Sequence, residues 1–352
     1  MRILVAMSGG VDSSTVAGLL AEQGHDVIGA TLQLYDHGAA VGRKGACCAG
    51  QDIHDARRVA DHIGIPHYVI DAEVRFRSAV MADFADSYAA GETPVPCVRC
   101  NQTVKFTDLL ALAGDLGASH MATGHYVRRV DGPAGAELHR AADPARDQSW
   151  FLFATTQAQL DRSLFPLGAM PDKAAVRAEA VRLGIAVAEK PDSQDICFVP
   201  TGSYADVVAK LRPDAAAAGE IVTTDGTIVG RHDGIARYTV GQAKRLGNAA
   251  QDGATRRVVV ALDPASRRVV IGPRSGGTTE IRLRDVNWLT PPRPLRCTVK
   301  LRAREEPHGA EVIPDGAGAL VRLDTAALPA PGQACVFYDG DRVLGGGFIR
   351  AS

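Results

Sequence analysis

The fold of this chain is decided by one stretch near its N-terminus, Ile3-Leu4-Val5-Ala6-Met7-Ser8-Gly9-Gly10-Val11-Asp12-Ser13-Ser14. Its first five residues are apolar and predict a buried strand, and a helical pattern runs from about Ser14 to Gln23. Between them, Gly9 and Gly10 allow a tight turn whose backbone N–H groups face inward. A glycine-rich turn at a helix N-terminus favours anions, because the N–H groups and the helix dipole both attract negative charge.

The side chains of this turn predict a site for the phosphates of a nucleotide. Ser8, Ser13 and Ser14 add hydroxyl donors. Asp12 would repel a phosphate, so we expect it to hold a Mg²⁺ ion that bridges the phosphates. The turn lacks the lysine of the GxxxxGK[ST] loop, which excludes that class of nucleotide site. An ordinary strand-to-helix turn is the alternative, but seven consecutive suitable residues favour a functional loop.

The first 200 residues alternate short apolar runs with helical patterns. This alternation predicts an α/β fold, in which a parallel sheet is covered by helices on both faces. Ligands of such sheets bind at the carboxyl ends of the strands. The further predicted strands are Val27–Leu32, His67–Ile70 and His120–Thr123, and the further predicted helices lie near Gln51–Ile63 and Thr107–Leu116.

After about residue 200 the pattern changes to short β-branched runs separated by Gly, Pro and Asp turns. This spacing predicts small antiparallel barrels or sandwiches. The length of 352 residues fits two or three domains of roughly 150 residues each. The segment Thr290–Pro294 is too stiff to continue a strand and is interpreted as a link between parts of this half. The predicted strands are Glu220–Val222, Thr227–Val229, Arg257–Leu262, Arg268–Ile271, Thr298–Leu301, Ala319–Leu323 and Ala334–Tyr338.

The overall composition is that of a globular protein. Its 46% hydrophobic and 22% charged residues exclude a disordered or fibrous chain. No apolar run reaches the roughly 18 residues of a membrane span, and the apolar N-terminal run is too short for a signal peptide. The seven cysteines, an odd number, are not typical of a secreted disulfide framework. We therefore expect a cytoplasmic protein without a membrane partner.

The net charge of −1 hides two unlike halves. Residues 1–200 carry 18 Lys and Arg against 24 Asp and Glu, whereas residues 201–352 carry 21 against 16. Most of the basic excess lies in residues 227–304, where 16 basic residues face 5 acidic ones. Such asymmetry indicates a basic RNA-binding face, because a merely solvated surface more often mixes the two signs.

Three cysteines lie in unusual contexts. Cys97 and Cys100 belong to a proline-stiffened loop, and Cys197 follows Asp192-Ser193-Gln194-Asp195-Ile196. The residues alone leave three interpretations open: inert buried thiols, ligands of a metal or Fe–S site, or a redox pair in which one thiol carries a persulfide and another resolves it. The other cysteines, Cys47, Cys48, Cys297 and Cys335, are interpreted as structural.

The turn Ser8–Ser14 resembles the SGGxDS motif of the PP-loop ATP pyrophosphatase family. Members of that family bind ATP, release pyrophosphate and adenylate a substrate oxygen, which a nitrogen or sulfur nucleophile then displaces. The resemblance implies ATP, with Mg²⁺ held by Asp12. It places the nucleotide at Ala6, Met7, Ser8, Gly9, Gly10, Val11, Asp12, Ser13, Leu32 and Gly124.

Motifs spread over the whole chain point to a narrower family. They are Cys47-Cys48, Asp55–Ala60, Gly64–Pro66, Cys97–Asn101, Lys105-Phe106, Ala122–Tyr126, Asp147–Ser149, Asp192–Phe198, Tyr238–Gln242 and Pro331–Ala334. From end to end these motifs resemble the bacterial tRNA-specific 2-thiouridylase family, which converts the wobble uridine of certain tRNAs to 2-thiouridine. The resemblance implies a PP-loop ATP-binding catalytic domain over residues 1–200, a small central β domain over 201–274 and a C-terminal β-barrel over 275–352.

The same resemblance implies roles for two of the thiols. The uridine C2 oxygen would attack the α-phosphorus of ATP, pyrophosphate would leave, and sulfur would then arrive at C2. Cys197 corresponds to the persulfide carrier, which a sulfur-donor protein loads. Cys100 corresponds to the nucleophile that releases the sulfur, a step that ends in a transient Cys100–Cys197 disulfide. Direct attack of the persulfide on C2, with later resolution by Cys100, is the alternative.

The resemblance also implies a set of tRNA contacts around a base that has left its stack. This chain has Val95 where the family usually has Asn, and Cys97 where some members have Asp. It has Ala303 where the family has an aromatic residue. Val95 therefore offers no side-chain hydrogen bond to the base, and Ala303 offers no ring for stacking. The implied contacts are Val95, Pro96, Cys97, His125, Arg146, Asp147, Gln148, Arg302, Ala303 and Gln333.

Two other functions stay open on the sequence. An Fe–S-dependent tRNA thiolase would use Cys97, Cys100 and Cys197 as cluster ligands. It would contain stoichiometric iron after anaerobic purification. A non-catalytic tRNA-binding module would use ATP only as a conformational ligand, and it would form no AMP.

Overall fold

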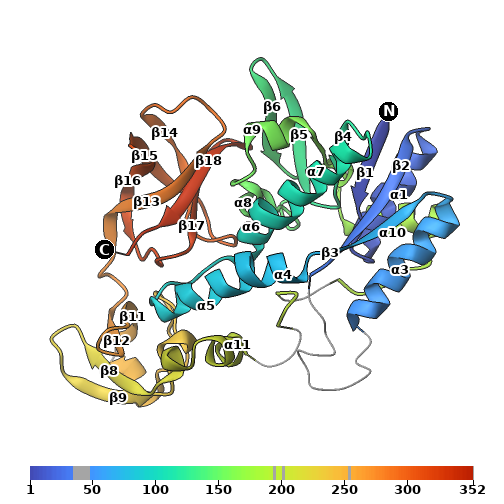
Figure 1. The fold of residues 1–352 in the computed structure, drawn as a ribbon. Coiled ribbons are helices and arrows are strands. Elements are labelled where there is room, and N and C mark those ends of the chain that lie inside the picture. Colours follow the sequence, from blue (N-terminus) through green and yellow to red (C-terminus); the bar gives the residue numbers. More distant parts are fainter. Residues whose placement is uncertain (35–47, 193–195, 200–202, 253–254, 352) are drawn as a thin grey trace. The chain divides into compact units, whose positions relative to one another are not determined.

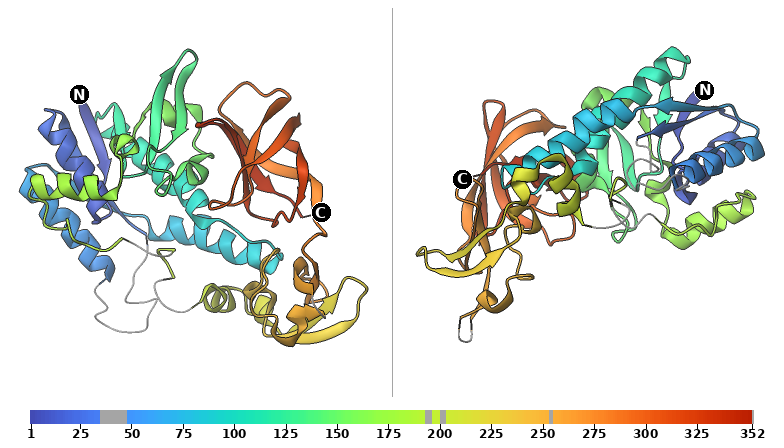
Figure 2. Two further views of the ribbon diagram at one scale, coloured as in Figure 1. Left: turned by 180° about the vertical axis from the view of Figure 1, so that it is seen from behind. Right: turned by 60° about the horizontal axis from the view of Figure 1, so that its bottom comes forward.

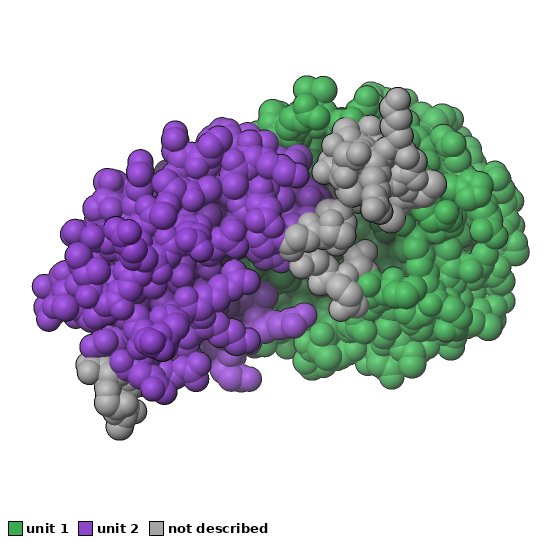
Figure 3. All heavy atoms as spheres, turned by 90° about the horizontal axis from the view of Figure 1, so that it is seen from below, with its two compact units in different colours: residues 1–80, 97–194, 341–343 green, residues 81–96, 195–340, 344–352 purple. Residues whose placement is uncertain are grey.

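A computed structural model describes residues 1–34, 48–192, 196–199, 203–252 and 255–351 of the chain (Figure 1). These residues form two compact units, which are described in turn (Figure 3). Unit 1 contains residues 1–80, 97–194 and 341–343, and unit 2 contains residues 81–96, 195–340 and 344–352. The glycine-rich turn therefore lies in unit 1, and most of the β-rich half lies in unit 2.

Unit 1 is built on a parallel sheet with the strand order β3-β2-β1-β4-β7. In the central strand β1, the residues Ile3, Leu4 and Val5 are all fully buried, so both faces of the sheet are covered. The predicted α/β class with a parallel sheet is confirmed. The strands are β1 (Arg2–Ala6), β2 (Asp26–Gln33), β3 (His67–Asp71), β4 (His120–Ala122) and β7 (Ser163–Leu164).

Helices pack against this sheet (Figure 2). Val16 of α1, Val59 of α3 and Val176 of α10 share one buried core with the strands, whereas α7 contacts β1 and β4. Among the described residues, no helix is both long and apolar enough to cross a membrane. The helices are α1 (Val11–Glu22), α3 (Cys48–Ile63), α7 (Phe106–Asp115), α8 (Ser149–Leu152), α9 (Gln157–Asp161) and α10 (Lys173–Arg182).

A run of short helices surrounds Cys97 and Cys100 in the chain. α4 (Glu73–Phe76) and α5 (Ala82–Ala89) are separated by a π-helical turn, and α6 (Pro96–Cys100) continues through a second such turn, Asn101–Lys105, into α7. π-Helical turns are rare and occur frequently at functional sites. After β4, unit 1 also contains an antiparallel hairpin that the sequence did not predict, β5 (Val127–Gly132) and β6 (Gly135–Arg140).

The central part of unit 2 is a sheet with the order β10-β11-β12-β8-β9. β11 and β12 are antiparallel, as predicted, but β12 pairs in parallel with β8. The expectation of a purely antiparallel arrangement is therefore wrong here, because the long connection between β8 and β12 permits a parallel crossover. The elements are α11 (Tyr204–Leu211), β8 (Gly219–Thr223), β9 (Ile228–His232), β10 (Gln251–Asp252), β11 (Thr255–Asp263) and β12 (Arg268–Pro273).

The C-terminal part of unit 2 is a closed barrel. Its strands pair in the order β13-β16-β15-β14-β17-β18, and β13 pairs with β18 to close it. Thr290–Pro294 joins two strands of this one barrel, so its interpretation as a link between parts of the half is wrong. The strands are β13 (Thr278–Trp288), β14 (Leu295–Lys300), β15 (His308–Asp315), β16 (Gly318–Ala327), β17 (Ala334–Asp339) and β18 (Arg342–Ile349).

Candidate functional site

The phosphate loop, residues 8–14, is held in shape by its own serines. The Ser8 N–H donates to Ser13 Oγ over 3.0 Å, and the two hydroxyl oxygens lie 3.2 Å apart. Ser13 Oγ also donates to the Gly10 carbonyl over 3.3 Å. The loop leaves the carboxyl end of β1 and enters α1 at Gly10, which is the N-cap residue. N–H groups, hydroxyls and a helix N-terminus are thus gathered in one turn, as an anion site requires.

Two glycines bring other segments close to this loop. Gly9 has φ +74°, and a Cβ there would lie 2.1 Å from the Asp52 carbonyl oxygen. A Cβ at Gly124, after β4, would lie 2.9 Å from Ser13 N and 3.0 Å from Asp12 Cβ. β1 and β4 are neighbours although β2 and β3 come between them in sequence, so the loop and Gly124 meet at the switch point of the sheet. Ligands of open α/β sheets bind at that point.

The other predicted nucleotide residues lie along the same edge of the sheet. Ala6 ends β1, and Met7 donates its N–H to the Ala30 carbonyl over 2.8 Å. Leu32 is half-buried near the end of β2, and Val11 begins α1. The fold therefore gathers the set at one edge, while its contact with a nucleotide stays a prediction.

The carboxylate of Asp12 has two partners that the sequence did not indicate. Lys173 Nζ, from the first turn of α10, lies 2.7 and 2.8 Å from its two oxygens, and only 11% of the lysine side chain is exposed. The Tyr126 hydroxyl donates to Asp12 Oδ1 over 2.6 Å. Burial and this hydrogen bond raise the pKa of Tyr126, so the phenol remains a donor. Lys173 also pairs with Asp192 over 2.8 Å, so it links two carboxylates.

This arrangement does not fit the predicted Mg²⁺ site at Asp12. Mg²⁺ needs oxygen ligands in near-octahedral geometry, whereas both Asp12 oxygens accept hydrogen bonds from an ammonium group. Within the part of the chain that the structure describes, no group of three or more His, Cys, Asp and Glu side chains is arranged to hold a metal ion. The cation that faces Asp12 in this structure is Lys173.

A second lysine contacts the backbone of the phosphate loop. Lys190 Nζ donates to the Gly9 carbonyl over 3.0 Å, to Asp52 Oδ1 over 2.7 Å and to Asp55 Oδ2 over 2.6 Å. Burial disfavours its charge, but the hydrogen bonds to the two carboxylates outweigh burial and raise the pKa of Lys190. Two lysines from distant parts of the sequence therefore flank a loop that contains no lysine.

Two of the three predicted thiols lie on the helix α6, so the expectation of a proline-stiffened loop around them is wrong: Pro96 is the first residue of the helix, where its fixed φ is compatible with helical geometry. Cys97 and Cys100 are three positions apart on this helix, yet Cys97 is exposed and Cys100 is buried. Burial, opposed by the charge of Lys105, raises the pKa of the Cys100 thiol. Because the thiolate is the nucleophile, burial makes Cys100 a weak nucleophile at neutral pH in this structure.

The third thiol, Cys197, is exposed in unit 2. The neighbouring Phe198 packs edge-to-face on Phe84 of α5, with ring centroids 5.2 Å apart, which anchors this stretch within the unit. Residues 193–195 of the same motif lie outside the described residues, as does Cys47. The disulfide between Cys100 and Cys197 stays a prediction. Cys335 lies in the core of the barrel and the partly buried Cys297 packs against that core, as expected for a structural role.

His125 is held within unit 1 by its neighbours. Its Nδ1 and Thr123 Oγ1 are hydrogen-bonded over 2.8 Å, and its ring lies 6.2 Å from that of Phe106. Burial, together with the charge of Lys105, lowers the pKa of His125 to about 3. The imidazole is therefore neutral at pH 7. Its predicted contact with tRNA would be a hydrogen bond or stacking and not a charge interaction.

The predicted tRNA-contacting stretch Arg146-Asp147-Gln148 has protein partners in this structure. Arg146 pairs with Asp192 over 2.7 Å, but 41% of its side chain is exposed. Asp147 accepts hydrogen bonds from two backbone N–H groups, and Gln148 Oε1 accepts from the Tyr126 N–H over 2.9 Å. Asp147 and Gln148 thus shape their own loop, whereas Arg146 keeps an exposed guanidinium. Their contact with RNA stays a prediction.

Of the remaining predicted contacts, Cys97 lies in unit 1 and the others lie in unit 2. Val95 and Pro96 are buried next to the exposed Cys97, and Ala303 is half-buried. Arg302 donates to the backbone carbonyls of residues 240 and 328 over 2.9 and 3.3 Å. Gln333 Nε2 donates to the carbonyl of residue 93 over 2.9 Å. Arg302 and Gln333 therefore connect parts of unit 2. Their contact with RNA stays a prediction.

Sequence reasoning missed Lys173 and Lys190 as partners of the phosphate loop. Lys173 is 161 positions from Asp12, and Lys190 is 181 positions from Gly9. One signal was present: a phosphate loop without a lysine, but with an aspartate, needs positive charge from elsewhere in the chain. Tyr126 and Lys190 lie in or beside motifs that were recognised, but those motifs do not reveal which atoms they contact.

Three family models match consecutive parts of the chain. The model described as "tRNA methyl transferase HUP domain" matches residues 1–201. The "tRNA methyl transferase PRC-barrel domain" matches residues 205–273, and the "Aminomethyltransferase beta-barrel domain" matches residues 278–349. The predicted fold class, an α/β domain followed by two small β-rich parts of which the last is a barrel, is confirmed.

Several curated proteins named "tRNA-specific 2-thiouridylase MnmA" are similar to this chain over nearly their full length. The protein from Acidiphilium cryptum is 70% identical, with 99% of this chain and 100% of that protein covered. The protein from Gluconobacter oxydans is 64% identical, with 100% and 99% covered. The protein from Rhodospirillum centenum is 61% identical, with 99% and 91% covered. The chain therefore belongs to the tRNA-specific 2-thiouridylase family.

Proposed function

We propose that this protein is an enzyme, a tRNA-uridine 2-sulfurtransferase, which uses ATP to convert the wobble uridine of tRNA to 2-thiouridine. The observation that carries the proposal is the phosphate loop with Gly124 packed against it at the switch point of the sheet. Membership of the 2-thiouridylase family supports tRNA as the substrate and ATP as the nucleotide. AMP, pyrophosphate and thiolated tRNA are the products.

In the first step, the uridine C2 oxygen attacks the α-phosphorus of ATP. A new O–P bond forms as the bond to pyrophosphate breaks, and the base becomes an adenylated electrophile at C2. The N–H groups and hydroxyls of Ser8–Ser13 bind the phosphates, because they form the helix N-terminal anion site. Lys173 and Lys190 supply the positive charge that stabilises the departing pyrophosphate.

In the second step, sulfur replaces AMP at C2. Cys197 carries a persulfide, which a separate sulfur-donor protein has loaded. The Cys100 thiolate attacks Cys197 Sγ, hydrosulfide leaves and attacks C2, and AMP departs. In the alternative order, the terminal persulfide sulfur attacks C2 directly, and Cys100 then attacks Cys197 Sγ to release the thiolated base. Both orders end in a Cys100–Cys197 disulfide, which an external thiol must reduce before the next turnover.

The proposal also assigns the parts of the chain. Residues 1–200 form the PP-loop catalytic domain, 201–274 the small central β domain and 275–352 the C-terminal β-barrel, a division that the three family matches support. The enzyme works in the cytoplasm and has no membrane partner. The tRNA contacts are Val95, Pro96, Cys97, His125, Arg146, Asp147, Gln148, Arg302, Ala303 and Gln333.

Mass spectrometry of nucleosides tests this function directly. Unmodified tRNA is incubated with the protein, ATP and a protein persulfide donor, and is then digested to nucleosides. We expect 2-thiouridine at the wobble position and one AMP for each modified base. Reactions without ATP or without the persulfide donor are the controls, and both should give none.

Two experimental outcomes would contradict this proposal and favour a different function. Binding of tRNA and ATP without AMP formation would favour a binding module. Stoichiometric iron in anaerobically purified protein, required for turnover, would favour an Fe–S-dependent thiolase with Cys97, Cys100 and Cys197 as ligands.

The basic stretch 227–304 predicts salt-dependent tRNA binding. Lys244 and Arg245 are exposed in this stretch, so their joint replacement by glutamine should weaken tRNA affinity at low salt. It should also lower the slope of log affinity against log salt by about two, one for each removed charge. The matched control is the exposed pair Arg57 and Arg58 on α3, replaced by glutamine in the same way. Equal effects of the two pairs would contradict a localised basic face.

A further inference from the structure

Two turns with no role in the proposed chemistry meet in unit 2. One is Tyr238–Gln242 of the central part, and the other is Pro331–Gln333, which lies between β16 and β17 of the barrel. Both belong to the motifs that carry the family resemblance. In these two turns, Gln333 is the one residue for which the sequence predicts a role, namely contact with tRNA.

Both turns bind Thr93, which lies two positions before Val95. The Thr93 N–H donates to the Pro331 carbonyl over 2.7 Å, and Gln333 Nε2 donates to the Thr93 carbonyl over 2.9 Å. Thr93 Oγ1 donates to Thr239 Oγ1 over 3.2 Å. The backbone of Thr93 is therefore bonded to the barrel, and its side chain is bonded to the central part.

The barrel turn approaches this segment very closely. Gly332 has φ +84°, and a Cβ there would lie 2.9 Å from Glu92 Cβ and 3.0 Å from Thr93 N, so only glycine fits without displacement. The Gly332 N–H donates to the Ile349 carbonyl over 2.9 Å, and the Ile349 N–H donates to the Gln333 carbonyl over 2.8 Å. These bonds tie the turn to β18, so it is a fixed support for Thr93.

Two arginines of the barrel strengthen the same junction. Arg284 of β13 pairs with Glu92 over 2.5 Å, with 31% and 16% of the two side chains exposed. Arg302 donates to the Val240 carbonyl over 2.9 Å, next to Thr239. The barrel thus holds the central turn as well as the segment that ends at Thr93.

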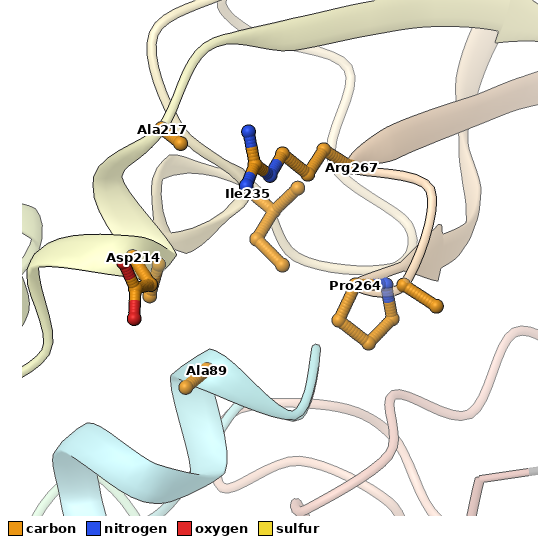
Figure 4. A pocket seen from close by; sticks show the side chains of 8 residues that line it. Ala89, Asp214, Ala217, Ile235, Pro264 and Arg267 are labelled. Atoms are coloured by element: carbon orange, nitrogen blue, oxygen red, sulfur yellow. The ribbon is translucent and has the colours of Figure 1, made fainter.

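Close to this junction, α5 also contacts the central part of unit 2. A cavity of about 210 Å³ opens there, lined among others by Ala89 of α5, Pro264 and Arg267 (Figure 4). α5 ends at Ala89, four positions before Thr93.

We propose that Thr239 and Pro331–Gln333 form a clamp on Thr93 that sets the position of Val95–Cys97, called here the base loop, whose last two residues begin α6. Gln333 is then a positioning residue for thiolation. Pro94 and Pro96 have fixed φ angles, which leaves fewer backbone dihedral angles to absorb a displacement of Thr93 before it reaches the loop. The inference rests on the proposed function, because that function assigns Val95–Cys97 to the target base. Through the clamp, the β-rich parts that carry the basic stretch control the loop that meets the uridine.

The test uses full-length Gln333→Met and Thr239→Val variants in the absence of tRNA and ATP. Hydrogen exchange is measured for the peptide spanning residues 91–100, and alkylation by iodoacetamide is measured at the exposed Cys97. We expect both rates to rise about fivefold in each variant, because each loses one hydrogen bond that holds Thr93. Matched controls are Gln157→Met, which removes a bond to a backbone carbonyl in unit 1, and Thr298→Val, which removes a hydroxyl in the barrel. Neither control should change these rates.

Kinetics with tRNA give the second readout. At saturating tRNA, the clamp predicts that Gln333→Met lowers kcat for thiolation, whereas a residue that only contacts tRNA would alter Kd and leave kcat unchanged. The clamp would be overturned if Gln333→Met and Thr239→Val both exchanged and were alkylated at the same rates as the wild-type protein. It would also be overturned if Gln333→Met altered only the Kd for tRNA. Exchange and alkylation need neither tRNA nor turnover. If the wild-type protein makes no 2-thiouridine but these rates rise as expected, the proposed function fails and the clamp stands.

Discussion

Replacement of Cys100 or Cys197 by serine is expected to lower tRNA thiolation by at least about a hundredfold. A serine hydroxyl can neither carry a persulfide nor attack one at neutral pH. Adenylation of the base precedes sulfur transfer, so pyrophosphate release in a single turnover should persist in both variants. Nucleoside mass spectrometry measures the first effect, and a single-turnover pyrophosphate assay measures the second.

The control for these variants is Cys297→Ser, which changes a half-buried thiol of the barrel and should retain activity. Full thiolation by both Cys100→Ser and Cys197→Ser would show that the assigned roles are wrong. In the wild type, the rate of the sulfur-transfer step should rise with pH up to the pKa of Cys100. The reason is that burial raises this pKa, and the thiolate fraction of Cys100 is therefore small at neutral pH.

The second large effect is expected for Lys173→Met. This change should lower kcat/KM for ATP in pyrophosphate release by about a hundredfold to a thousandfold. Removal of the ammonium group leaves Asp12 without the cation that lies 2.7 Å from it, whereas Asp192 keeps its ion pair with Arg146. The uncompensated Asp12 carboxylate would then repel the phosphates of ATP at the loop. Steady-state kinetics with varied ATP measure the effect.

A double-mutant cycle separates two roles of Lys173. If the lysine acts together with Asp12 on ATP, Lys173→Met with Asp12→Asn should be little worse than the more severe single variant. Recovery of activity in the double variant would contradict this and would show that Lys173 only neutralises Asp12. Lys210→Met, at an exposed lysine of α11, is the matched control. Thermal unfolding of each variant reports whether loss of the partly buried ion pair also destabilises the fold.

The local pattern of apolar and polar residues was sufficient to predict most helices and strands of the first half of the chain. Val27–Leu32 was predicted and Asp26–Gln33 is observed, and Thr107–Leu116 was predicted where Phe106–Asp115 is observed. The hairpin β5–β6 was missed because its strands carry alternating charged residues and no continuous apolar run. The parallel pairing of β12 with β8 was also missed, since a strand pattern does not reveal which strand becomes its neighbour.

The sequence by itself determined the phosphate loop, because the conformation of Ser8–Ser14 depends on glycine dihedral angles and on hydrogen bonds between residues at most five positions apart. It also identified Cys97, Cys100 and Cys197 as the thiols to consider. Only the tertiary structure decided that Lys173, and not a lysine within the loop, faces Asp12. Likewise, only the tertiary structure joined Gln333 to Thr93, 240 positions away. Contacts of this kind depend on how distant segments pack, and packing is a property of the whole chain that no local pattern encodes.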